Sequence, residues 1–287
     1  MRIKKRYLGL GAIVIFLAML QLEFFAFRES DTEQAKILKD KGVKNPAFYS
    51  YEFEGQQIHY THVGNPEQPL LILVHGAPGS SSAMLPYLSD TLLGQSFQLI
   101  AVDRPGYGYS NYGVSEPSLE KQSKAMLELI KRHPNPATIL LGHSYGGPVI
   151  VRMAIDAPEL IQGLCIVAGS IDPKLEPQEW WRGPVNWPII RSLLPGSLRV
   201  ANQEIMVLYS ELQEMMKYWD QVICQVLVFQ GMEDKLVPKG NAAFAEKMLT
   251  NAASVDIRMI EGGNHFILWS MQAEIREGLI NMLKTLN

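Results

Sequence analysis

The sequence predicts an α/β protein with a mostly parallel sheet and helices on both faces. Short apolar runs alternate with helix-like segments, and four of the six runs are almost entirely apolar, as strands covered on both faces must be. Repeated strand and helix units require parallel strands with right-handed crossovers. The expected strands are 70–76, 97–103, 138–144, 164–170, 226–231 and 255–263, and the expected helices are roughly 80–93, 118–133, 145–157, 239–250 and 267–286.

A β-hairpin precedes this alternation. Residues 48–55 and 57–64 alternate apolar and polar side chains with the period of half-buried strands, and Glu54 and Gly55 form the turn between them. The hairpin brings the expected sheet to eight strands.

The charge of the chain is distributed unevenly. Residues 1–28 hold five of the 26 basic residues and one of the 29 acidic residues, so the remainder has 21 basic and 28 acidic residues. An acidic body is a poor electrostatic partner for nucleic acid, and we exclude this class of partner.

The N-terminal segment is typical of a membrane anchor. Sixteen residues without a charge, 7–22, follow a cluster of basic residues at positions 2–6. As a helix extended to Phe27, the segment is about 31 Å long and can cross a hydrocarbon core of roughly 30 Å. The basic cluster places the N-terminus in the cytoplasm and the body on the extracytoplasmic side. A cleaved signal peptide is the alternative, but LAMLQLEFFAFRES lacks the small residues of a cleavage site.

These patterns divide the chain into four parts. We expect a basic segment and anchor in 1–28, a polar stalk in 29–46, the core of the body in 47–170 and 222–287, and a small helical cap in 171–221. The cap is expected because its 51 residues are far more than a connection between two strands needs. It would cover the carboxyl ends of the strands, where open α/β sheets bind ligands.

Four of the five tryptophans lie in this insertion. Their aromatic side chains favour an apolar or amphipathic substrate, and packing of the cap on the body is the alternative role for each of them. The expected substrate contacts are Trp180, Trp181, Trp187 and Trp219.

The stretch LLGHSYGGP, residues 140–148, places a serine at a strand-to-helix corner. Gly142 and Gly146 flank Ser144 at two residues' distance, and glycine leaves room for the strained backbone of such a corner. The hydroxyl would stand at a helix N-terminus, where N–H groups favour developing negative charge. The G-x-S-x-G pattern is weak alone, but its place between a strand and a helix suits a nucleophile.

A nucleophilic serine needs a base and a group that orients the base. Asp234 and His265 each follow a predicted strand, so both are expected at the sheet edge that carries Ser144. Asp172, which follows another strand, is the rival candidate for the acid. The small-residue loop that begins at His75 can turn the N–H of Ala77 towards that of Tyr145 and so form an oxyanion hole.

Several further polar residues have expected structural roles. We expect His75 to brace the oxyanion loop, His143 to pack away from Ser144, and His59 to lie at the surface or at a sheet edge. Asp103 and Arg104 are expected to form an internal ion pair or hydrogen bonds. Cys165 and Cys224 begin strand-like runs and are expected to be buried free thiols, with a single disulfide as the alternative.

Residues 47–287 resemble the α/β-hydrolases, in particular the group with a cap after the sixth strand. The resemblance rests on HGAPG at 75–79, VDRPGYGYS at 102–110, GHSYG at 142–146, the turn at 231–234 and GNH at 263–265. It implies Ser144 as nucleophile, His265 as base and Asp234 as its orienting acid, in the chain order of that fold. Dehalogenases and epoxide hydrolases of the family carry Asp at the elbow, so Ser144 disfavours both.

The function expected from the sequence is that of a membrane-anchored serine hydrolase acting on a carboxylic ester, with thioesters and amides as alternatives. Two other functions stay open, a non-catalytic ligand-binding module displayed at a membrane and a cofactor-free peroxidase activity at the same site. The chain has no phosphate-binding loop, metal-binding cluster or dinucleotide fingerprint, so no cofactor or metal is expected. The expected partners are a small-molecule or lipid ester and the membrane, and the oligomeric state is left open.

Overall fold

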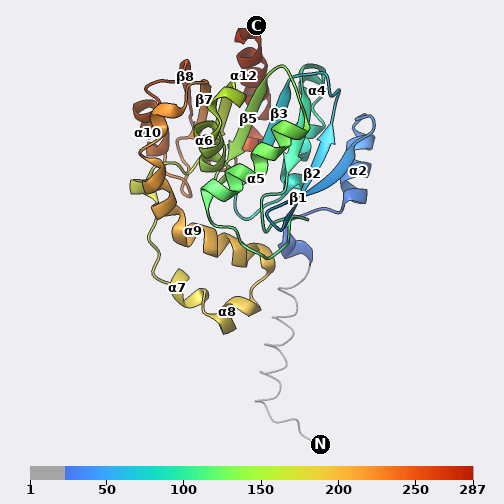
Figure 1. Cartoon of the computed structure of the whole chain (residues 1–287). Coiled ribbons are helices and arrows are strands. Elements are labelled where there is room, and N and C mark those ends of the chain that lie inside the picture. The colour runs from blue at the N-terminus through green and yellow to red at the C-terminus, as the bar shows by residue number, and fades with distance from the viewer. Residues whose placement is uncertain (1–22, 287) are drawn as a thin grey trace, which may run out of the picture.

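An eight-stranded sheet organises the chain. A computed structural model describes residues 23–286, and its strand order is β1-β2-β4-β3-β5-β6-β7-β8 (Figure 1). The β1–β2 and β2–β4 pairings are antiparallel, and all other pairings are parallel, which confirms the predicted sheet. The strands are β1 (Ala47–Phe53), β2 (Gln56–Val63), β3 (Leu70–Val74), β4 (Gln98–Val102), β5 (Thr138–His143), β6 (Gly163–Val167), β7 (Gln225–Gly231) and β8 (Ser254–Ile260).

The strands differ in burial according to their place in the sheet. Every residue of β3, β4, β5 and β6 is buried, because helices cover both faces of the centre. At one edge, β1 and β2 are joined by Glu54 and Gly55, whose φ angles of 48° and 77° give the two-residue turn of a tight hairpin.

Two helical layers cover the sheet and bury separate apolar clusters. Successive residues of a strand enter opposite clusters, as Leu71 and Ile72 of β3 do. One cluster packs α5, α6 and α10 on the sheet, and the other packs α3, α4, α11 and α12. These helices are α3 (Leu85–Leu88), α4 (Thr91–Ser96), α5 (Leu119–Arg132), α6 (Gly146–Asp156), α10 (Gly240–Met248), α11 (Ile267–Ser270) and α12 (Gln272–Thr285).

The segment between β6 and β7 is helical. It contains α7 (Arg182–Val185), α8 (Pro188–Leu193) and α9 (Gly196–Met215), with short 3₁₀ turns at η4 (Pro173–Leu175) and η5 (Trp219–Gln221). Figure 1 shows α9 lying across one end of the sheet, with α7 and α8 on its far side. Leu208 and Leu212 of α9 are buried in the same apolar cluster as α5 and α6, so α9 is part of the folded body.

The segment predicted as a stalk is instead a helix packed on the body. Ser30 and Glu33 form a capping box at the start of α2 (Asp31–Asp40), and Leu38 is fully buried. Thr61 of β2 donates a hydrogen bond to Gln34 at 3.3 Å, which ties the helix to the sheet. The stalk was predicted from local polarity, which carries no information on these long-range contacts.

The predicted membrane anchor lies mostly outside the described residues. Its last part, η1 (Glu23–Ala26), is a single 3₁₀ turn in which Ala26 is buried. Within residues 23–286 we find no helix with the length and apolarity that a membrane crossing requires. The remaining 3₁₀ turns of the described chain are η2 (Ser81–Met84) and η3 (Pro158–Leu160).

Both cysteines, Cys165 and Cys224, are buried free thiols, as predicted. Burial raises the pKa of the Cys224 thiol to about 12, and it also raises the pKa of Cys165.

Candidate active site

Ser144 stands at a sharp corner between β5 and α6. Its φ angle of 53° lies in the left-handed region, which is strained for a residue with a side chain. A Cβ at Gly142 would overlap the carbonyl oxygen of Gly146, and one at Gly146 would overlap the carbonyl oxygen of Val74. The backbone of the corner therefore closes only with glycine at both positions, while the Ser144 side chain keeps partial exposure.

Asp234 and His265 form a buried pair at the carboxyl ends of the strands, the end of the sheet at which Ser144 also lies. They follow the parallel neighbours β7 and β8, and the Nδ1–H of His265 donates to Oδ2 of Asp234 at 2.8 Å. The other carboxylate oxygen accepts the backbone N–H groups of Leu236 at 2.9 Å and Val237 at 2.8 Å. Burial acts to raise the pKa of Asp234, but these hydrogen bonds and that from His265 hold it below its ordinary value. The carboxylate therefore stays ionised and orients the imidazole.

His143 connects the serine corner to the histidine loop. The residue precedes Ser144 on β5, and its Nε2–H donates to the backbone carbonyl of His265 at 3.1 Å. The two imidazole rings lie 5.0 Å apart. Burial, together with the nearby His265, lowers the pKa of His143 to about 4, so the ring is neutral. The predicted packing role was incomplete, because a position next to Ser144 on a strand does not reveal a partner 122 residues away.

The loop after β3 passes against the serine corner. A Cβ built on Gly76 would lie 3.0 Å from Cβ of Ser144, so the residue before Ala77 is packed against the corner whose next residue, Tyr145, is the N-cap of α6. His75 braces this loop, since its Nδ1–H donates to the Gly76 carbonyl at 2.7 Å and its Nε2 accepts the Arg104 N–H at 3.0 Å. Burial and the charge of Arg104 lower the pKa of His75 to about 3, so its ring is neutral.

Comparison with known proteins agrees with this geometry. A family model described as the alpha/beta hydrolase fold matches residues 69–188. The chain is 25% identical over 188 residues to the dihydrolipoyllysine-residue acetyltransferase component of an acetoin cleaving system from Pseudomonas putida, covering 64% of this chain and 50% of that protein. It is 30% identical over 154 residues to an uncharacterized hydrolase of Saccharomyces cerevisiae, covering 50% of this chain and 51% of that protein. The chain thus spans about half the length of these curated relatives.

Solved structures extend the match over nearly the whole chain. The crystal structure of a bacterial membrane phospholipase A superposes with a TM-score of 0.65 at 16% identity, covering 98% of this chain and 99% of that one. The chain has the α/β-hydrolase fold. This fold occurs in proteins of several different activities, so the chemistry of the chain depends on the residues of its own site.

The rival acid has a different role. Asp172 caps η4, where its carboxylate accepts the N–H of Lys174 at 2.9 Å. Asp234 is the carboxylate that contacts His265. Among residues 23–286, no group of three His, Cys, Asp or Glu side chains is placed to hold a metal ion.

The four cap tryptophans occupy two environments. Trp180 and Trp187 are 83% and 64% exposed, and Trp181 lies under the Arg182 guanidinium at 4.4 Å. Trp219 is 1% exposed and packs edge-on against Phe244, so it is a core residue and not a surface that substrate can reach. The sequence could not separate these cases because the burial of Trp219 depends on Phe244, which lies outside the insertion.

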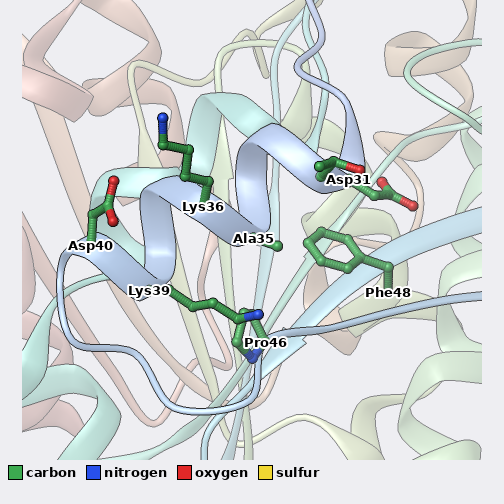
Figure 2. Close-up of a pocket in the computed structure, with 8 residues that line it drawn as sticks. Asp31, Ala35, Lys36, Lys39, Asp40, Pro46 and Phe48 are labelled. Atoms are coloured by element: carbon green, nitrogen blue, oxygen red, sulfur yellow. The ribbon is translucent and has the colours of Figure 1, made fainter.

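A surface groove lies elsewhere on the molecule, between α2 and β1 (Figure 2). In the sheet, β1 is separated from β5 and Ser144 by β2, β4 and β3, or roughly 20 Å at the usual strand spacing. The groove is therefore distinct from the candidate active site. Its walls are formed by Asp31, Thr32, Ala35, Lys36, Lys39, Asp40, Pro46 and Phe48.

Proposed function

We propose that this α/β-hydrolase is a serine hydrolase that cleaves carboxylic esters. The observation that carries the proposal is the 2.8 Å hydrogen bond between His265 and Asp234 at the sheet edge where Ser144 stands in its strained corner. Epoxide hydrolases and dehalogenases need a carboxylate nucleophile, and a serine hydroxyl at the elbow favours acyl transfer instead.

The proposed reaction proceeds through an acyl-enzyme. Ser144 Oγ attacks the substrate carbonyl while His265 Nε2 takes the hydroxyl proton, and Asp234 stabilises the imidazolium that forms. The backbone N–H groups of Ala77 and Tyr145 would donate to the tetrahedral oxyanion. His265 then gives its proton to the leaving alcohol, and water attacks the acyl-enzyme by the same steps in reverse.

An apolar or amphipathic acyl substrate is the proposed substrate class. The outer part of the cap exposes Trp180, Trp187 and Ile189, the last at 78%. Large exposed apolar side chains of this kind mark contact with lipid or with an apolar ligand. The structural similarity to a bacterial membrane phospholipase A supports the same proposal.

We also propose that the enzyme is attached to a membrane, with the N-terminus in the cytoplasm and the catalytic domain on the other side. The proposal rests on the uncharged segment 7–22 and the preceding basic cluster. Ser197 of α9 donates a hydrogen bond to the carbonyl of Phe25, so the start of the described chain lies beside the cap. A reporter fused after Asn287 should be active only outside the cytoplasm. Activity confined to the cytoplasm would reverse the proposed topology.

The function is tested with p-nitrophenyl esters of increasing acyl length and the purified full chain in detergent. We expect turnover that rises from acetate to octanoate and that Ser144→Ala abolishes. Turnover that does not rise with length would contradict the substrate class. A folded enzyme that hydrolyses no ester, thioester or amide would favour the binding-module alternative, and peroxide-dependent halogenation would favour the peroxidase alternative.

A further inference from the structure

A buried ion pair joins the cap to the loop after β4. Arg104 of that loop and Glu204 of α9 are both fully buried, and they are 100 residues apart in the chain. The Nη1 and Nη2 atoms of Arg104 donate to the two carboxylate oxygens of Glu204 at 2.6 Å and 3.1 Å. This two-point contact fixes the plane of the guanidinium as well as its position.

All donors of the Arg104 side chain are used. Besides the two bonds to Glu204, Nη1 donates to Gln122 at 2.9 Å, Nε donates to the His75 carbonyl at 2.9 Å, and Nη2 donates to the Gly76 carbonyl at 3.2 Å. A guanidinium has five N–H groups, and each has a partner here. Rotation of the guanidinium would therefore break several buried hydrogen bonds together.

The contact with Gly76 bears directly on the proposed oxyanion hole. The Gly76 carbonyl and the Ala77 N–H belong to one planar peptide unit and point in opposite directions. Arg104 and His75 hold the carbonyl end of this unit, at 3.2 Å and 2.7 Å respectively. A peptide held by its carbonyl presents its N–H in a fixed direction, away from Arg104 and towards the other side of the loop.

The same guanidinium contacts the second oxyanion residue. Its central carbon lies 4.5 Å from the centre of the Tyr145 ring and 4.7 Å from that of the Tyr107 ring. The Tyr107 hydroxyl donates to Glu204 at 2.6 Å and so helps to hold the carboxylate. Arg104 is thus the link between the cap and both residues whose N–H groups are proposed to stabilise the oxyanion.

We propose that Glu204 of the cap is a positioning residue for the oxyanion hole and acts through Arg104. The inference rests on the proposed function, because it assigns a catalytic purpose to the Ala77 and Tyr145 N–H groups. The ion pair is not explained by stability alone, since buried ion pairs can often be replaced by apolar residues without loss of stability. On this view α9 completes the catalytic machinery, and the cap does more than cover the substrate.

The test compares four variants of the full chain with wild type for ester hydrolysis and thermal unfolding. Glu204→Gln leaves the Arg104 charge uncompensated and should lower both kcat and stability. The double variant Arg104→Met with Glu204→Leu removes both charges, so it should be more stable than Glu204→Gln while kcat stays about 10²-fold below wild type, the scale of a lost oxyanion donor. KM should change less than kcat, because the oxyanion forms only in the transition state. The control is Glu214→Gln on the same helix, whose exposed ion pair with Lys217 is remote from Arg104.

The outcomes separate this inference from the proposed function. A double variant that recovers stability and also wild-type kcat would overturn the positioning role and leave a purely structural ion pair. If the double variant is as unstable as Glu204→Gln, the decisive comparison is with Glu204→Asp. This variant keeps the charge near Arg104 and should regain part of kcat if Glu204 positions the guanidinium. Equal loss in Glu204→Asp and Glu204→Gln, with a matching loss of folded protein, would also overturn the inference. A wild-type enzyme without ester turnover would instead refute the proposed function.

Discussion

Replacement of Asp234 by asparagine should separate its orienting role from its packing role. One oxygen of the carboxylate accepts two backbone N–H groups, from Leu236 and Val237, and the other accepts the Nδ1–H of His265. The oxygen of an asparagine would stay with the backbone donors, and its NH₂ group would then face His265. Two donors cannot share a hydrogen bond, so the imidazole proton would move to Nε2, where the ring can no longer accept the serine proton.

The size of the loss in kcat can be estimated from the free-energy cost of the flipped side-chain orientation that would keep His265 in its active tautomer. A flipped side chain would restore an acceptor to His265 but leave the N–H groups of Leu236 and Val237 facing an NH₂ group. The bond from Val237 is buried and the bond from Leu236 is partly buried, and unsatisfied donors of this kind cost about 1–3 kcal/mol each, or about 2–6 kcal/mol together. At about 1.36 kcal/mol for each factor of ten, kcat should fall by about 30-fold to about 2 × 10⁴-fold.

The assay is steady-state hydrolysis of the best p-nitrophenyl ester by Asp234→Asn, with thermal unfolding to establish that the variant is folded. The matched control is Asp172→Asn, which alters the cap of η4 and should leave kcat within about threefold, since an N-cap contributes stability and not catalysis. A folded Asp234→Asn enzyme with less than a tenfold loss would refute the orienting role. A large loss in Asp172→Asn alone would transfer that role to Asp172.

Three further predictions concern stability and reactivity. Gly146→Ala should lower the unfolding temperature and turnover together, because its Cβ would overlap the Val74 carbonyl, whereas Gly94→Ala, with nothing within 4 Å, should raise stability by about 0.5 kcal/mol in the same assay. Burial lowers the pKa of His59, but its hydrogen bond to Asp103 and the Asp103 charge raise the pKa overall. The stabilisation by the His59–Asp103 pair is therefore full below about pH 6.5 and is lost as the pH rises through the pKa of His59 in the folded protein. The unfolding free energy measured in urea is expected to be higher for wild type than for His59→Gln, and this difference should shrink as the pH rises. A difference that grows with pH would contradict this pairing. Because both cysteine thiols are buried, iodoacetamide should alkylate neither in the folded enzyme at pH 8 and both in urea, as measured by intact mass.

The sheet and the serine corner were predictable because their signals are local. Apolar runs with few polar residues indicate strands covered on both faces, and β3 to β6 are such strands. The glycines around Ser144 indicated that the backbone leaves no room for side chains there. In the structure the carbonyl oxygens of Val74 and Gly146 occupy that space. The catalytic roles of Ser144, Asp234 and His265 remain predictions that the proposed experiments test.

The features that the sequence did not reveal depend on contacts between distant segments. α2 was predicted as a stalk because its composition is polar, and its hydrogen bond from Thr61 joins residues 27 positions apart. Trp219 was expected at the substrate, but its burial depends on Phe244 of α10. Arg104 was expected to form an internal pair, and its partner Glu204 lies 100 residues away on α9. Polarity and periodicity describe a segment and do not identify its partner.

The most direct test of the account is covalent labelling of the full chain with a fluorophosphonate, measured by intact mass for wild type and Ser144→Ala. An activated serine forms a stable phosphonyl adduct, whereas an ordinary serine does not react. We expect a single adduct on the wild-type enzyme and none on the variant. An adduct on both proteins, or a folded wild type that stays unlabelled, would contradict the assignment of Ser144 as the nucleophile.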